Sequence, residues 1–160
     1  ACSEDRYTAI MVCYLIAVLA DGQPAHHRAL YDAGACEAVV ATMKAFPNDF
    51  HVSILGCGAM AKLGGRHAAA RQALCRTDAA EVLVTAMRAW VLGDGNGRLA
   101  QAACSTLYQL GRRCDMTVEA LGRVGACAAV VEAMRASAFR NIGYDLLGFI
   151  TACQVRAQTC

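Results

Sequence analysis

Three stretches of this chain repeat one another, and this repetition restricts the possible folds more than any other feature. The copies are AGACEAVVATMKAF at residues 33–46, TDAAEVLVTAMRAW at 77–90 and VGACAAVVEAMRAS at 124–137. Matched residues recur after 44 and 47 positions, as they do at Leu30, Leu74 and Leu121. Such a period, with apolar residues at helical spacing inside each copy, predicts a solenoid of helical units.

Each copy predicts three helical segments. In the first copy, residues 24–32 predict a short helix with Pro24 in its first turn. Residues 34–46 predict a second helix, and residues 49–63 a third, with Asp49 as its N-cap and a stop at the following two glycines. We therefore expect one all-α domain over residues 1–160, with a partial repeat at 5–20 and repeats at about 24–65, 66–113 and 114–153.

The internal sequence of each copy resembles armadillo repeats. The resemblance is carried by ALYDAGACEAVV, ALCRTDAAEVLV and ALGRVGACAAVV, and it extends over nearly the whole chain. HEAT repeats are the near alternative, but they have two helices in each unit and usually a shorter period. The resemblance implies a right-handed armadillo-like superhelix of about three repeats plus a partial N-terminal repeat. It implies little about function, because such solenoids serve many unrelated processes.

In armadillo proteins the third helices line a concave surface, which the resemblance makes the expected binding surface here. In importin-alpha and beta-catenin, an Asn near the end of this helix holds the peptide backbone. The matched position holds Val18, Lys62, Gln109 and Phe149 in this chain, which argues against a nuclear-import receptor. The candidate protein-binding residues are Met11, Tyr14, Val18, His51, Lys62, Gln109 and Phe149. Each of them could equally face a neighbouring helix.

The first predicted helix is apolar on every side. In YTAIMVCYLIAVLA, residues 7–20, only Thr8 is clearly polar, which predicts burial all round. Terminal repeats normally carry a polar outer face. We therefore expect either a longer solenoid or a protein partner that covers residues 7–20 and possibly the concave groove. The apolar run is too short for a transmembrane segment, which needs about 20 residues.

No pattern in the sequence predicts catalysis, a cofactor or a metal site. The glycine-rich residues 93–97 lack the Lys-Ser or Lys-Thr of a phosphate loop, and Arg98 stands where a calcium loop needs an oxygen ligand. The adjacent His26 and His27 point about 100° apart on a helix, so they cannot share one ion. A net charge of +2 gives no electrostatic case for nucleic acid.

The ten cysteines predict buried thiols rather than a disulfide scaffold. Several recur at matched positions within apolar helical stretches, namely Cys13, Cys57 and Cys104, and Cys36 and Cys127. Reduced thiols indicate an intracellular protein, cytoplasmic or organellar, and not a secreted one. The cysteines outside this pattern, Cys2, Cys75, Cys114 and Cys160, leave a thiol redox sensor as a less favoured hypothesis.

Taken together, these patterns predict a non-catalytic scaffold for protein–protein interaction that docks in a larger assembly. The sequence starts at Ala1 rather than Met, which favours one alternative. This alternative is an accessory structural subunit of an organellar (mitochondrial or plastid) membrane protein complex, from which a targeting peptide has been removed.

Overall fold

The computed structural model describes residues 2–90, 97–111 and 115–136, and the regular structure of this part is helical throughout. The helices are α1 (Cys2–Leu19), α2 (Pro24–Asp32), α3 (Ala35–Ala45), α4 (Phe50–Arg66), α5 (Ala68–Arg76), α6 (Ala79–Trp90), α7 (Arg98–Gly111), α8 (Asp115–Arg123) and α9 (Ala126–Ala136). The prediction of an all-α chain is confirmed for these residues. Most of the predicted loop at 93–97, and residues 137–153 of the third predicted repeat, lie outside them.

The ends of the helices follow from local sequence. Pro24 occupies the first turn of α2, as expected. Gly34 precedes α3 with a φ of 77°, and Gly125 precedes α9 with a φ of 68°. Glycine adopts this left-handed conformation without the penalty that a Cβ imposes, so it suits both turns. The Asp49 carboxylate accepts hydrogen bonds from the backbone N–H groups of His51 at 2.9 Å and Val52 at 3.0 Å, which confirms it as the N-cap of α4.

The expected end of α4 at Gly64 and Gly65 is wrong, because the helix continues to Arg66. Gly64 is buried, and a Cβ added to it would lie only 2.5 Å from Cδ2 of Leu110 on α7. The glycine therefore allows close helix packing here instead of ending the helix. The chain leaves the helical conformation at His67, whose Nδ1 accepts a hydrogen bond from the Ala70 N–H at 3.1 Å and so caps α5.

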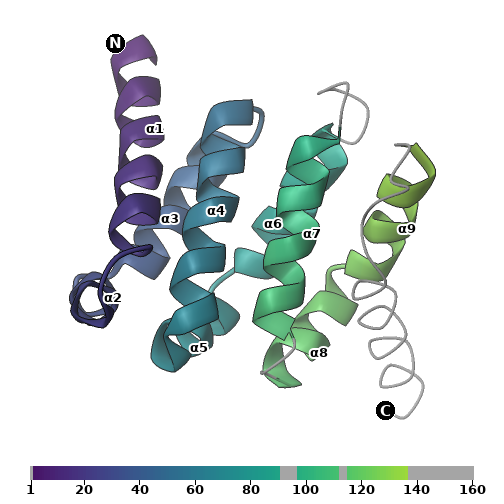
Figure 1. Ribbon diagram of the computed structural model, residues 1–160. Helices are drawn as coiled ribbons and strands as arrows, with labels where there is room; N and C mark the ends of the chain where they lie inside the picture. Colours follow the sequence, from purple (N-terminus) through teal and green to yellow (C-terminus); the bar gives the residue numbers. More distant parts are fainter. Residues whose placement is uncertain (1, 91–96, 112–114, 137–160) are drawn as a thin grey trace.

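Helices α1, α4 and α7 run in the same direction and lie side by side, and we call them the row (Figure 1). The contacts behind the row repeat from one group of helices to the next. Helix α3 packs on α4 as α6 packs on α7, and α3 contacts α6 as α6 contacts α9. We call α2–α4 the first unit and α5–α7 the second unit. This arrangement leaves α1 at one edge of the row.

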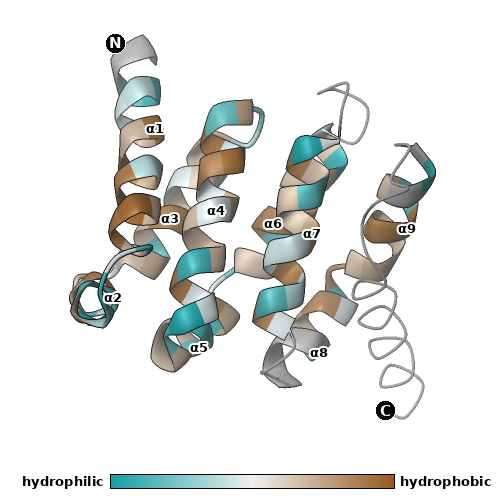
Figure 2. Ribbon diagram, viewed as in Figure 1, coloured by the Kyte–Doolittle hydropathy of each residue, from teal (hydrophilic) through white to brown (hydrophobic). Residues whose placement is uncertain are grey.

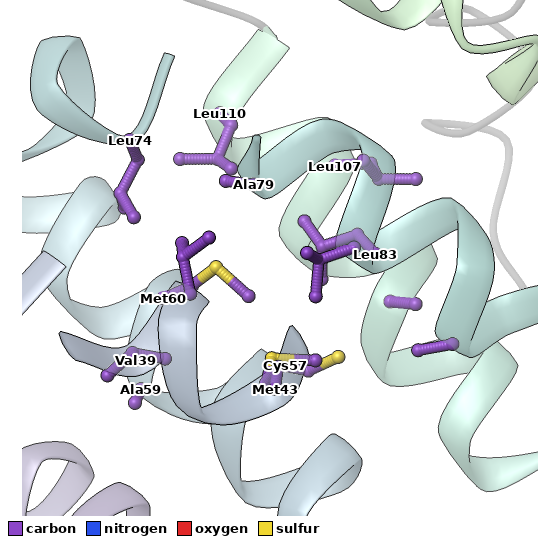
Figure 3. Packing of buried hydrophobic residues seen from close by; sticks show 14 of the residues in the cluster. Val39, Met43, Cys57, Ala59, Met60, Leu74, Ala79, Leu83, Leu107 and Leu110 are labelled. Atoms are coloured by element: carbon purple, nitrogen blue, oxygen red, sulfur yellow. The ribbon is translucent and has the colours of Figure 1, made fainter. Parts of the chain in front are cut away.

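The hydrophobic core is continuous across the two units. The side chains of Val39 and Met43 on α3, Met60 on α4, Leu83 on α6 and Leu107 on α7 are each at most 2% exposed. Figure 3 shows residues of both units converging on this shared core. Neither unit therefore buries its apolar surface alone, which explains why similar residues recur in each copy.

Candidate protein-interaction surface

The sequence-predicted candidates on α1 lie on one side of that helix. Tyr14 and Val18 are about half exposed, and Met11 is partly buried. Tyr7, which is also exposed, continues the series at residues 7, 11, 14 and 18. A spacing of four, three and four residues places side chains on the same helical face. These residues therefore form a continuous apolar strip along α1.

The polar candidates contact neighbouring helices and do not form one cluster. The Lys62 ammonium is 3.1 Å from the carboxylate of Asp21, just beyond α1, and the Gln109 side chain lies against Gly65 of α4. His51 Nδ1 is 3.4 Å from the guanidinium of Arg6 on α1. His51 and Lys62 are separated by about 16 Å along α4, given the rise of a helix. Phe149 lies outside the described residues.

Ion pairs join α1 to α4 at both ends. The Arg6 guanidinium pairs with the Asp49 carboxylate near the start of α4, and Asp21 pairs with Lys62 near its end. Burial alone would raise the pKa of Asp49. The hydrogen bond from the Val52 N–H and the charge of Arg6 outweigh this effect, so the pKa of Asp49 is lowered. The two helices are thus held in a fixed register.

The exposed large hydrophobic side chains of the described residues all lie on α1. They are Tyr7, Tyr14, Leu15, Val18 and Leu19, and we call them the N-terminal apolar face. In Figure 2 the lower half of α1 is mainly brown, although this helix is at the edge of the row. Single exposed apolar residues are ordinary, but a contiguous apolar patch indicates an interaction site. The sequence-based expectation of burial on all sides is not met within the described chain.

Comparison with matched positions on α4 and α7 explains why residues of this face are exposed. Adding 44 to a residue number on α1 gives the matched position on α4, and adding 47 to that gives the one on α7. Leu15 corresponds to Ala59 and Thr106, and Leu19 corresponds to Leu63 and Leu110. The side chains of these four residues on α4 and α7 are at most 1% exposed, whereas Leu15 is 51% and Leu19 45% exposed. Equivalent positions are thus covered in α4 and α7 and open in α1.

Two contacts identify the neighbour that covers these positions. The Thr106 hydroxyl on α7 donates a hydrogen bond to the backbone carbonyl of Cys57 on α4 at 3.1 Å. The Leu110 side chain lies over Gly64 of α4. Both residues therefore face the preceding helix of the row. By the same register, Leu15 and Leu19 face the place that a further helix beside α1 would occupy.

The sequence does not single out Leu15 and Leu19 as candidates. The candidates that it predicts belong to the expected concave surface, at a different angle around the helix. The signal that would have found them is the register itself. The residues matched to Leu15 and Leu19 in the next two copies are Ala, Thr or Leu inside otherwise apolar stretches, a pattern typical of packed helix interfaces.

The buried cysteines are poorly suited to thiol chemistry. Cys13, Cys36, Cys57 and Cys104 are free and at most 1% exposed, as the sequence predicts for packing residues. Burial raises the pKa of Cys13 to about 11 and that of Cys57 to about 12. These thiols stay protonated at neutral pH, and the thiolate is the reactive form. Cys75 is partly buried, whereas the side chain of Cys2 and all of Cys114 and Cys160 lie outside the described part of the structure.

Among the described residues, the other polar groups and the surface cavity are weaker candidates for a site. Within the described part of the chain, no group of three His, Cys, Asp or Glu side chains is arranged to hold a metal ion. A surface cavity of about 190 Å³ between α3 and α6 has Lys44 and Glu81 in its lining. Typical small-molecule pockets are larger, at about 300–1,000 Å³. None of the described helices is both long enough and apolar enough to span a bilayer.

One buried histidine differs from its counterpart in the second unit. His27 on α2 is 3% exposed, and neither ring nitrogen has a hydrogen-bond partner. Burial, together with the nearby positive charge of Arg66, lowers the pKa of His27. The matched residue in the second unit is Arg71, which donates a hydrogen bond to the Gly64 carbonyl at 2.8 Å. His27 thus occupies the same place without the same bond.

Comparison with known proteins gives no match to a family model, to a curated protein or to a solved structure. The resemblance to armadillo repeats therefore rests on the repeated residues themselves. Within the described residues, the N-terminal apolar face is the surface that differs most from an ordinary solvent-exposed helix.

Proposed function

We propose that this chain is a non-catalytic, armadillo-like scaffold for protein–protein interaction that docks in a larger assembly through its N-terminal apolar face. One observation carries the proposal. The exposed large hydrophobic side chains of the described residues are gathered on one helix, at positions that α4 and α7 bury. A surface of this kind is unfavourable in water, so a protein that retains it as a monomer is expected to use it for binding.

The repeated arrangement of helices supports the scaffold part of the proposal. Units that share one core and repeat their neighbour contacts are typical of solenoids, which bind partners over extended surfaces. The order of the helices in each unit, short and then two longer ones, agrees with an armadillo-like superhelix. The protonated state of the buried cysteines favours a structural role for them over redox sensing.

A double substitution on the proposed surface tests the function. We expect the unaltered chain at micromolar concentration to bind a fluorescent hydrophobic dye. We also expect the Leu15→Lys/Leu19→Lys variant to lose most of that signal while its circular dichroism stays unchanged. Gln72→Lys/Gln101→Lys is the matched control, because it adds the same charge at exposed positions of α5 and α7. An unaltered chain that is monomeric by light scattering and binds no dye would contradict the proposal.

A further inference from the structure

Towards the ends of α4 and α7, neighbouring helices of the row pair a large residue with a small one. There the later helix contributes the large residue and the earlier helix the small one, as where Leu110 packs over Gly64. One helix earlier, the matched pair is Leu63 on α4 and Ala20 at the end of α1, and both are fully buried. A large residue on a small one lets two helices approach closely, in the manner of a ridge in a groove.

The side of α1 that faces α4 carries the small partners of this interface. Cys13 is close enough to Cys57 that the two thiols influence each other electrostatically, which places Cys13 on that side. Ala9, Ala17 and Ala20 share this side, since they lie four residues before, four after and seven after Cys13. All four are buried. The surface that α1 offers to α4 is therefore mainly a stripe of Ala and Cys at residues 9, 13, 17 and 20, with the buried Ile16 beside it.

The outer side of α1 has the opposite character. Its residues Leu15 and Leu19 are large, and they occupy the positions through which α4 and α7 contact the helix before them. Leu19 matches leucines on both helices, whereas Leu15 is larger than its matches, Ala59 and Thr106. The chemistry of the missing contact is therefore defined by the two interfaces that the structure already contains. Both interfaces pair parallel helices, as Figure 1 shows for the row.

We propose that the N-terminal apolar face binds an α-helix of a partner protein. This helix lies parallel to α1 and presents a stripe of Ala, Gly, Ser or Cys at the spacing i, i+4, i+8 and i+11. The inference rests on the proposed scaffold function and adds the chemistry of the partner. It continues along the row the same large-on-small interface that joins α1 to α4 and α4 to α7.

The charges of the row indicate that the partner helix is uncharged where it meets this face. On α4, Lys62 reaches back to Asp21. The position matched to Lys62 on α1 is Val18, which is apolar and half exposed. The partner helix therefore needs no carboxylate in the place that Asp21 takes beside Lys62. A charged group there would lose its hydration without gaining a pair, which is costly.

A second copy of this chain fits the face less well. Two copies meeting through the same face would form a two-fold interface, in which each residue set must complement itself. Leucine and tyrosine side chains would then oppose one another, whereas Leu110 of α7 packs over a glycine of α4 within the row. A heterologous contact with a small-residue stripe preserves the close approach seen between α1 and α4.

A helical peptide with the expected stripe tests the proposal. The probe has the sequence of residues 3–21, with the residues of the N-terminal apolar face replaced by Gln and Lys. Cys13→Ala prevents oxidation, and a lactam bridge between residues i and i+4 on the replaced side stabilises the helix. We expect it to bind the full chain in fluorescence anisotropy with a Kd on the order of tens of micromolar, as suits one helix on a small interface. Replacing its Ala9, Ala17 and Ala20 by Leu is expected to weaken binding at least tenfold.

The same titration with variants of the full chain locates the contact. Leu15→Lys/Leu19→Lys should weaken peptide binding at least tenfold, and Gln72→Lys/Gln101→Lys should leave it unchanged. The proposal is overturned if the peptide does not bind, if the leucine-rich peptide binds equally well, or if the Leu15→Lys/Leu19→Lys variant still binds. It is also overturned if the unaltered chain forms a dimer, or binds phosphatidylcholine vesicles, and the Leu15→Lys/Leu19→Lys variant does not. If the unaltered chain binds the dye but not the peptide, this inference alone is refuted. If it binds neither, the scaffold function is refuted as well.

Discussion

Helices α1 and α4 occupy matched places in the row, but the same side of each helix meets different surroundings. On α4 this side carries Ala59 and Leu63, which are fully buried where the row continues to α1. On α1 it carries Leu15 and Leu19, which are about half exposed. Leu19 and Leu63 are the same residue type, so at this position only the neighbour differs. Exposure on α1 is therefore a property of its position at the edge of the row and not of an unusual sequence.

The comparison predicts that one substitution has two different costs. Leu63→Ala removes a buried side chain and leaves a cavity, so we expect it to lower the free energy of unfolding by about 2–5 kcal/mol. Leu19→Ala at the matched exposed position should change it by less than about 1 kcal/mol. Urea denaturation followed by circular dichroism measures both. Equal losses would mean that α1 is covered in the isolated chain, for example by self-association.

Glycines of α4 sharpen the comparison between the two sides of that helix. Gly64→Ala forces a Cβ against Leu110, and we expect a net loss of about 1–2 kcal/mol after the gain in helix propensity. Gly58→Ala meets no atom within 4 Å and should stabilise the helix by about 0.5–1 kcal/mol. Chemical denaturation of the two variants measures this difference. A stabilising Gly64→Ala would show that the contact with Leu110 is looser than described.

A pH titration tests the buried His27 of the first unit, whose place is taken by Arg71 in the second unit. Because burial lowers the pKa of His27 in the folded chain, its unfolded form, with a pKa of about 6.5, binds protons first as the pH falls. We expect the melting temperature to decrease as the pH falls through about 6.5, and the decrease to level off below the pKa of folded His27. His27→Met should remove this part of the pH dependence, whereas His26→Gln, at an exposed site, should not. An identical profile for the unaltered chain and His27→Met would exclude His27 as the cause.

The smallest expected effect concerns basic residues that link successive units. Lys44 on α3 pairs with Asp78, and its match Arg88 on α6 is 3.5 Å from the Gly125 carbonyl and 3.9 Å from the Glu132 carboxylate. These groups are about half exposed, so solvent screens them. Lys44→Ala and Arg88→Ala are each expected to cost less than about 0.5 kcal/mol by thermal or urea denaturation. A loss above 1 kcal/mol would indicate that these contacts set the register between units.

The sequence was sufficient to predict features that depend on local chemistry or on periodicity. Pro24 in the first turn of α2 and Asp49 as an N-cap follow from the hydrogen bonds that a helix start requires. The burial of Cys13, Cys57 and Cys104 follows from their recurrence in apolar stretches. The signals for a helix start lie within a few neighbouring residues, and the signal for burial lies in the comparison of matched positions in successive copies.

Features that depend on contacts between units were harder to predict. Gly64 looks like a helix stop in isolation, and only the position of Leu110 explains why the helix continues through it. The sequence predicts Lys62 as a groove residue, but its pairing with Asp21 depends on how α4 lies against α1. Leu15 and Leu19 cannot be recognised from the sequence of α1 alone, because an apolar residue on an apolar helix carries no signal until its exposure is known. Residue spacing gives the period, but not the angle at which each unit faces the next.

The column of buried cysteines along the row has a practical consequence. Cys13, Cys57 and Cys104 give α1, α4 and α7 one protonated, inaccessible thiol each. An alkylating reagent can modify such a thiol only when its helix separates from the others, so the rate of labelling at each cysteine measures how often that helix opens. The chain thus contains its own set of reporters for local unfolding. Labelling at Cys13, before and after a partner is added, would record directly how much the partner stabilises the edge of the molecule.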